Sequence, residues 1–343
     1  MKVALFVSAT PFVRGGTELL IDELKQQLEE RGHKAKLFRL PFTYEFETGM
    51  FLNALSAQLL NFDYYDVLLS FKWPTYLAAH RHKNLWIFHQ FRQAYDMFGE
   101  HYGLNDDETG NAIKQLVIQT DAVALNQVKN IFALSQSAKR LEEYSGIVAD
   151  VLYTPLPNSE KYHNNDTGNY IYCASRMDGM KRQLMAVEAM RYTKSGAKLI
   201  LDGKCEDDSL MKKMYSIIET YGLDDKVTIN AEFVPEAVKI DRFANCLAGI
   251  YIPLDEDSPG LVTFEILYSH KALITVNDSG GVANFSSNSN HAFVVEPTPQ
   301  AIAEKIDYLY ENKAVARQMG ENAYMYIVNL NVNWDDTIRR LLA

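Results

Sequence analysis

Two acidic side chains, Asp257 and Glu265, stand eight positions apart in a segment whose pattern suggests a binding site. An apolar run, Gly249–Pro253, comes before Asp257, and a second apolar run, Ala272–Val276, comes after Glu265. The pattern is typical of a strand, a tight loop, a helix and another strand. Because parallel α/β sheets bind ligands at the carboxyl ends of their strands, we expect the loop at Asp257 to face a ligand.

Between the two acids, the chain enters the expected helix at Gly260, Leu261 and Val262. The first N–H groups of a helix have no carbonyl partner within it and favour an anion. Glu265 lies inside this helix, where a buried carboxylate needs a partner such as the hydroxyls of a ribose. Asp257 suits either a sugar ring or a simple helix cap. A nucleotide-sugar, with phosphates between hydroxyl-rich ends, fits the segment.

Further candidates follow three other expected strands. Arg176 and Lys181 come after Tyr170–Ala174, and such cations either grip a phosphate or belong to a solvated turn. Gly15 and Gly16, after the first strand, either let the backbone approach a ligand or form a flexible turn. His89 closes a strand in the first half, where we expect it to donate to a phosphate or sugar oxygen. The weaker candidates for contact with an acceptor are Arg14, Lys72, Arg92 and Tyr95.

Strand and helix patterns alternate through the whole chain, which predicts an α/β protein with doubly wound parallel sheets. The opening Lys2–Ala9 reads as a buried strand and not as a leader. We expect two Rossmann-like domains that face a central cleft, residues 1–157 on the acceptor side and 158–325 on the donor side. Residues 326–343 are expected to pack back towards the first domain as a helix. Residues 93–120 read as an irregular loop or lid.

Composition narrows the partners. Of the 343 residues, 47% are apolar and 23% are charged, as in a soluble globular protein, and the net charge is −10. No basic groove is apparent, so nucleic acid is not an expected partner. No stretch approaches the roughly 20 apolar residues that span a bilayer. The three cysteines are far apart and lack ligand spacing, which predicts a reducing, cytoplasmic setting without a cysteine-bound metal.

The ordered series of these motifs resembles the retaining, GT-B-fold glycosyltransferases of family 4 (glycosyl transferases group 1). The resemblance rests on Asp257-Ser-Pro-Gly-Leu-Val-Thr-Phe-Glu265, on Asp278-Ser-Gly-Gly281, and on Ser175-Arg176 with Lys181-Arg182. In the first half, Gly15-Gly16-Thr17-Glu18 and the region around His89 are also similar. Two departures fall where the donor sugar rests in the family. Asp257 stands where the family usually has Glu, and Ser258-Pro259-Gly260 replaces the usual Gly-Phe-Gly turn.

The resemblance implies transfer of a hexose-type sugar from a UDP- or GDP-sugar to a hydroxyl acceptor, with retention of configuration. The acceptor is a glycan, a lipid-linked saccharide or a similar molecule of polysaccharide biosynthesis, and the setting is cytoplasmic or peripheral at the inner membrane face. It also implies chemistry without a metal or other cofactor, since Asp255-Glu256-Asp257 belongs to the sugar loop.

The same resemblance assigns roles to the candidate residues. Donor binding is assigned to Gly15, Gly16, Arg176, Lys181, Gly260, Leu261, Val262 and Glu265, and the reaction itself to Asp257, His89, Arg176 and Lys181. Two alternatives stay open: a sugar-nucleotide epimerase of the same fold, and an inactive nucleotide-sugar-binding protein.

Overall fold

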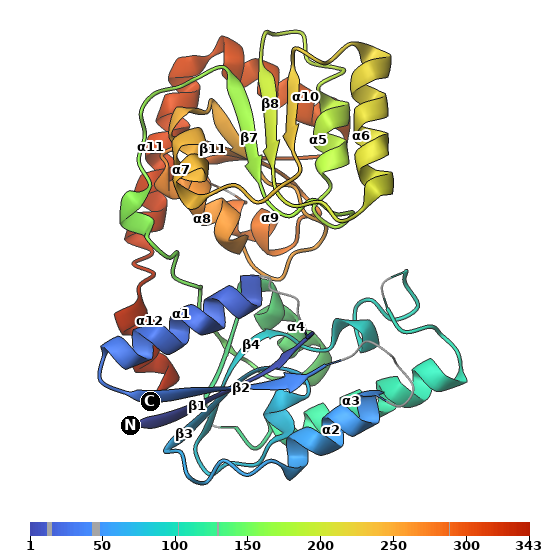
Figure 1. Ribbon diagram of the computed structural model, residues 1–343, viewed down its shortest axis with the longest axis vertical. Coiled ribbons are helices and arrows are strands. Elements are labelled where there is room, and N and C mark those ends of the chain that lie inside the picture. The colour runs from blue at the N-terminus through green and yellow to red at the C-terminus, as the bar shows by residue number, and fades with distance from the viewer. Residues whose placement is uncertain (12–15, 43–48, 102, 129, 288) are drawn as a thin grey trace. The chain divides into compact units, whose positions relative to one another are not determined.

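The computed structural model describes residues 1–11, 16–42, 49–101, 103–128, 130–287 and 289–343. The chain divides into two compact units. Unit 1 comprises residues 1–155 together with 333–343, and unit 2 comprises residues 156–332 (Figure 1). Within the described residues, no helix is both long and apolar enough to cross a bilayer.

Unit 1 is built on a six-stranded sheet in the order β2-β1-β3-β4-β5-β6, with every pair parallel. Its strands are β1 (Lys2–Ala9), β2 (Lys34–Pro41), β3 (Val67–Lys72), β4 (Lys83–His89), β5 (Asn130–Ala133) and β6 (Asp150–Val151). Its helices are α1 (Gly16–Glu30), α2 (Gly49–Leu59), α3 (Glu108–Leu125), α4 (Ser135–Ser145) and α12 (Trp334–Leu341), with short 3-10 turns η1 (Thr75–Leu77) and η2 (Arg92–Ala94). Buried side chains of α1 and α12 share one core with the sheet, and those of α2, α3 and α4 share another. The sheet is therefore covered on both faces, as its apolar strands predict.

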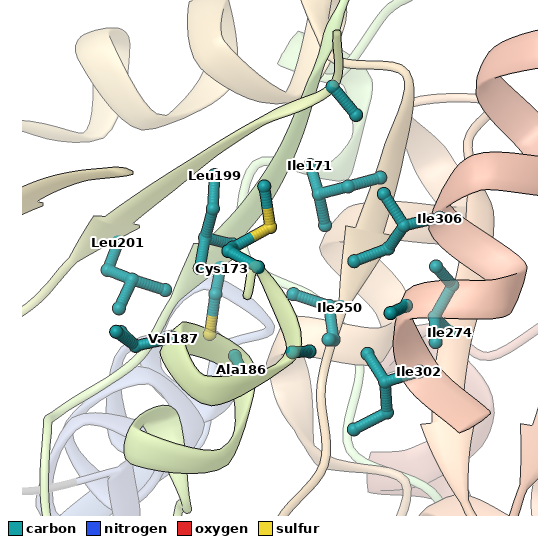
Figure 2. Packing of buried hydrophobic residues seen from close by; sticks show 14 of the residues in the cluster. Ile171, Cys173, Ala186, Val187, Leu199, Leu201, Ile250, Ile274, Ile302 and Ile306 are labelled. Atoms are coloured by element: carbon teal, nitrogen blue, oxygen red, sulfur yellow. The ribbon is translucent and has the colours of Figure 1, made fainter. Parts of the chain in front are cut away.

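Unit 2 repeats the architecture with the strand order β12-β11-β10-β7-β8-β9, again parallel throughout. The strands are β7 (Tyr170–Ala174), β8 (Lys198–Asp202), β9 (Val227–Asn230), β10 (Ala248–Ile250), β11 (Ala272–Val276) and β12 (Ala292–Val295). The helices are α5 (Gln183–Ala189), α6 (Asp208–Tyr221), α7 (Glu236–Asn245), α8 (Gly260–Tyr268), α9 (Gly281–Ser286), α10 (Pro299–Glu311) and α11 (Lys313–Asn329), and η3 (Ser159–Lys161) precedes the sheet. Figure 2 shows the apolar packing of β7 and β8 against α5 and α10.

The order of the strands fixes where a ligand site can form in unit 2. The chain leaves β7 towards β8 and β9 on one side, and then returns to place β10 on the other side of β7. The connections therefore diverge between β7 and β10. Such a switch point leaves a crevice at the carboxyl ends of the two strands, and ligands of α/β proteins bind there.

The carboxyl end of the chain belongs to unit 1, although α11 does not. Asn333 begins α12 by accepting a hydrogen bond from Asp336 N, and Ile338 and Leu341 are buried in the unit 1 core. The side chain of Asn84 in β4 donates to Leu341 O at 2.9 Å, which anchors the helix to the sheet. Unit 2 therefore extends to Val332, whereas the sequence placed its end at residue 325.

Among the described residues, helices α3, α7 and α9 were not expected from the sequence. Residues 93–120, read as an irregular loop or lid, contain the end of η2 and most of α3. Asp107 caps α3 by accepting a hydrogen bond from Gly110 N. The polar residues around Asp107 therefore mark the start of a helix and not the middle of a loop. Helix α7 is short and many of its residues are charged, so its apolar face was not recognised in the sequence, yet it carries Lys239, which pairs with Glu265 of the candidate site.

Candidate functional site

Three loops meet at the switch point of unit 2, those that follow β7, β10 and β11. Backbone hydrogen bonds join them: Leu254 N donates to Met180 O at 2.7 Å, and Gly281 N donates to Glu256 O at 2.6 Å. A β-carbon on Gly281 would lie 2.7 Å from backbone atoms of Ser258. Glycine is therefore required where the loops after β10 and β11 cross, and the contact fixes the approach to α8.

The two cations predicted to hold a diphosphate lie together in the loop after β7. Asp178 accepts a hydrogen bond from Arg176 Nε at 2.8 Å through one oxygen, and from the backbone N of Lys181 at 2.9 Å through the other. The side chain of Arg176 is mostly exposed, whereas that of Lys181 is mostly buried. One residue, Asp178, thus closes the turn and places both cations on the same loop.

Lys181 reaches from this loop to the loop after β10. Its Nζ donates to Tyr251 Oη at 3.0 Å and forms an ion pair with Glu256. Burial lowers the pKa of Lys181, but Tyr251 and Glu256 outweigh burial and hold the pKa above its usual value. The ammonium is therefore charged at neutral pH, and its carboxylate partner is Glu256.

Helix α8 begins beside the same tyrosine. Gly260 has φ +74°, and a β-carbon there would lie 3.0 Å from the ring of Tyr251. Ser258 Oγ accepts the N–H of Gly260 at 3.1 Å. The N–H groups of Leu261 and Val262 precede the first carbonyl partners within the helix. The start of α8 therefore offers amide donors next to the Tyr251–Lys181 pair, while Asp257 lies half-buried in the loop just before it.

Glu265 is 5% exposed and has found partners that the sequence did not indicate. Its Oε1 accepts from Tyr162 Oη at 3.1 Å and from Lys239 Nζ of α7 at 2.5 Å. No described residue donates to Oε2. Burial raises the pKa of Glu265, and Lys239 and Tyr162 oppose that rise. The carboxylate is thus held through one oxygen, with the other available to a ligand hydroxyl.

In unit 1, two candidate side chains end neighbouring strands. Lys72 closes β3 and His89 closes β4, and the two residues are paired in the register of the sheet. Burial lowers the pKa of Lys72, an effect that Glu18 partly offsets. Gly16 begins α1 with open space around its α-carbon. The predicted Arg14 and Gly15 lie outside the described residues.

The imidazole of His89 is neutral and its tautomer is fixed. Burial, with Lys72 nearby, lowers the pKa of His89 to about 4. Its Nδ1 lies 2.7 Å from Gln90 O, and a carbonyl oxygen only accepts, so Nδ1 carries the proton. Nε2 is then a hydrogen-bond acceptor. The sequence suggested that His89 donates a hydrogen bond to a ligand oxygen. In the structure its Nε2 is instead placed to accept a hydrogen bond, for example from a ligand hydroxyl.

Arg92 and Tyr95, both expected to face an acceptor, are engaged inside unit 1. Arg92 is buried, and its guanidinium donates to Asp96 at 2.7 Å and 2.9 Å. Tyr95 Oη donates to Asp121 at 2.8 Å. Contact of Arg92 with an acceptor does not fit this burial, because the interaction with Asp96 would have to break first.

Asp121 is the centre of a buried network whose ionisation predicts a pH effect on stability. It accepts from Tyr76 and Tyr95, each at 2.8 Å, yet burial raises its pKa from 3.8 to about 6. Since the folded state holds this proton more tightly than the unfolded state, the stability that Asp121 contributes at low pH is lost as pH rises from about 4 to 6. Two pKa units correspond to about 3 kcal/mol.

We therefore expect the free energy of unfolding of Asp121→Asn to rise by about 2–3 kcal/mol relative to that of the wild type as pH increases from 4 to 7. Denaturant unfolding of both proteins across this range measures the difference in their free energies of unfolding. The buried His89 has the opposite pH dependence, but it is present in both proteins, so its effect cancels in the difference. Glu29→Gln, at an exposed carboxylate of the same unit, is the matched control. A difference that does not change with pH would show that Asp121 is ionised throughout.

Comparisons with known proteins agree with this architecture. Residues 157–326 match the model of a family described as glycosyl transferases group 1, while no curated protein sequence matches the chain. Within the described residues, no group of three or more His, Cys, Asp or Glu side chains is arranged to hold a metal ion.

Three solved structures illustrate the likeness. A glycosyltransferase from Rickettsia africae superposes with a TM-score of 0.74 at 19% identity, covering 98% of this chain and 97% of its own. A sucrose-phosphate synthase from Thermosynechococcus elongatus gives 0.73 at 14% identity, with coverages of 97% and 96%. HepE from Anabaena, in complex with UDP and glucose, gives 0.68 at 15% identity, with coverages of 98% and 100%. The chain thus has the GT-B fold of glycosyltransferases, and its second unit matches the glycosyl transferases group 1 family over nearly its whole length.

Proposed function

We propose that the protein transfers a hexose-type sugar from a nucleoside diphosphate sugar to a hydroxyl acceptor, with retention of configuration and without a metal ion. One observation carries this proposal. The loop after β10 and helix α8 form a continuous segment that meets Lys181 at one end and presents the half-engaged Glu265 at the other. A diphosphate fits the first end and a ribose fits the second. The UDP bound to HepE and the glucose-6-phosphate bound to a trehalose-phosphate synthase of the same fold support this choice of substrates.

The leaving group determines what the cations contribute. As the bond between the sugar and the diphosphate breaks, negative charge grows on the phosphate oxygens. In this proposal the donor diphosphate first displaces Glu256 from Lys181, and Lys181, Arg176 and the first amides of α8 then stabilise that charge. Asp257 orients the sugar hydroxyls from the loop before α8. The acceptor hydroxyl attacks on the face from which the diphosphate departs, and a phosphate oxygen of the donor takes its proton.

The acceptor is the less defined partner. His89 of unit 1 is set to accept a hydrogen bond from a sugar hydroxyl, and Lys72 beside it carries a cation. A glycan or lipid-linked saccharide acceptor suits these groups. The free cysteines Cys173, Cys205 and Cys246 suit a reducing compartment, so we place the reaction in the cytoplasm.

Release of nucleoside diphosphate tests the function directly. UDP- and GDP-sugars are incubated with a panel of glycan and lipid-linked acceptors, with and without EDTA. We expect transfer that survives EDTA and a product that keeps the anomeric configuration of the donor. Conversion of the donor without any acceptor would instead indicate an epimerase. Donor binding without turnover across the panel would indicate a binding protein.

The Lys181–Glu256 ion pair makes a separate prediction about affinity. Because the carboxylate of Glu256 competes with phosphate for the same ammonium, Glu256→Gln should tighten the binding of UDP or GDP about fivefold. Isothermal titration calorimetry measures the change, and uridine or guanosine, which lack phosphates, should bind both proteins equally. Weaker binding of the diphosphate by the variant would show that Glu256 assists the donor.

A further inference from the structure

Arg182 ties together the three loops at the switch point of unit 2. Its Nε donates to Ile252 O at 2.9 Å, and one terminal nitrogen donates to Pro253 O at 2.8 Å. The same guanidinium holds both oxygens of Asp278, at 2.7 Å and 2.9 Å. Arg182 itself belongs to the loop after β7, while Ile252 and Pro253 follow β10 and Asp278 follows β11. One side chain therefore spans all three loops.

These contacts occupy the guanidinium. The side chain of Arg182 is 13% exposed, and its four hydrogen bonds are all made to the protein. Bidentate pairing with a carboxylate is a strong bond of arginine with a specific geometry. Although the sequence grouped Arg182 with Lys181, it is thus not placed to take a phosphate, which would have to displace Asp278.

The backbone at Arg182 is held in a conformation that its side chain does not favour. Its φ is +55° and its ψ is +34°, the left-handed region in which a β-carbon is crowded. Strained backbone of this kind persists when surrounding contacts over-determine it, and it gathers at functional sites. Here the bonds of the guanidinium supply those contacts.

We propose that Arg182 and Asp278 are positioning residues that set the distance between Lys181 and the start of α8. Lys181 immediately precedes Arg182, and the loop that Arg182 grips through Ile252 and Pro253 continues into Asp257 and Gly260. This inference rests on the proposed function, because the role that it gives to Arg182 and Asp278 is to align the donor diphosphate. The pair itself exists independently of that function, and it is measurable without substrate.

The two contributions of Arg182 are separable. Arg182→Gly removes the guanidinium and also relieves the backbone strain, since glycine adopts positive φ freely. Arg182→Lys keeps the charge and the strain but cannot hold Asp278 and two carbonyls at once. Asp278→Asn removes the charge of the partner. Lys204→Ala, an exposed cation of the same unit bonded to Glu206, is the matched control.

Hydrogen exchange of the full chain tests the brace without any ligand. The amides of Leu254, Asp255 and Gly281 donate across the loops, and we expect each to exchange about tenfold faster in Arg182→Gly and Asp278→Asn. Amides of β7 and β8 in the sheet should keep their protection. Unchanged exchange of the loop amides in folded variants would overturn the brace.

Transfer and binding then test the positioning role. Because a misplacement of about 1 Å costs on the order of 100-fold in rate, kcat/KM should fall 10- to 100-fold in Arg182→Gly, Arg182→Lys and Asp278→Asn, but not in Lys204→Ala. Affinity for UDP or GDP should fall while that for uridine or guanosine stays constant, and millimolar guanidinium should restore part of the activity of Arg182→Gly. Loosened loops with wild-type transfer and diphosphate affinity would overturn the role. If the wild-type protein bound neither UDP nor GDP, the proposed function would be refuted. The hydrogen-exchange data would still show whether Arg182 and Asp278 hold the loops together.

Discussion

Replacing Glu265 by glutamine should lower the affinity for a nucleoside and for its diphosphate by the same factor, about 100-fold. Hydrogen bonds to a charged group contribute about 1.5–3 kcal/mol each, and a ribose offers two hydroxyls to the second carboxylate oxygen of Glu265. The loss is common to uridine and UDP, or to guanosine and GDP, because the ribose is common to both. Calorimetric titration of the four ligands gives the factors, and transfer should fall at least as much.

The design of the variant protects this test from misfolding. Glutamine keeps the shape of Glu265 and one acceptor oxygen for Tyr162 and Lys239, and Lys239 lies partly in water. Glu321→Gln, at an exposed carboxylate of unit 2 that pairs with His270, is the control. Equal affinities of wild type and Glu265→Gln for all four ligands, in proteins of equal melting temperature, would remove Glu265 from the site.

Replacing Lys181 by alanine should separate phosphate binding from ribose binding. Removal of one preorganised charge from a site where an anion develops typically costs about 100- to 1,000-fold in kcat. We expect that loss in transfer and about a tenfold loss of affinity for UDP or GDP, with no change for uridine or guanosine. The Glu265 and Lys181 variants thus have distinct signatures, since the change at Glu265 lowers the affinity for the nucleoside and the change at Lys181 does not.

Lys204→Ala serves again as the control for removal of a cation. The former partner of Lys181, Glu256, is partly exposed and gains water in the variant, so the loop after β10 should stay folded. A fall in nucleoside affinity equal to that for the diphosphate would contradict the assignment of Lys181 to the phosphates. Wild-type transfer by the variant would contradict it as well.

Local patterns were enough to predict the frame of the fold. Continuous apolar runs gave β1 and β7 with their observed bounds, because strands covered on both faces have little room for polar residues. The turn at Pro259–Gly260 predicted the start of α8, since the helix begins at Gly260, directly after the acidic loop that follows β10. Short charged helices such as α7 were not predicted, because their buried face has too few apolar residues to show a helical pattern.

The partners of the site residues were beyond local reasoning. Tyr162 and Lys239 contact Glu265 although they lie 103 and 26 residues from it in the sequence, and no sequence spacing predicts such contacts. The acceptor character of His89 depends on one backbone carbonyl, whose position only the folded loop determines. Arg182 shows the same limit, because a cation beside Lys181 suggests a phosphate ligand until the fold shows its bonds to Asp278.

The most direct test of the site is a crystal structure of the protein with UDP or GDP. We expect the diphosphate to displace Glu256 from Lys181 and to lie against the first amides of α8, with a ribose hydroxyl on Glu265 Oε2. A nucleotide bound elsewhere, with the Lys181–Glu256 ion pair intact and Glu265 held only by Tyr162 and Lys239, would contradict it.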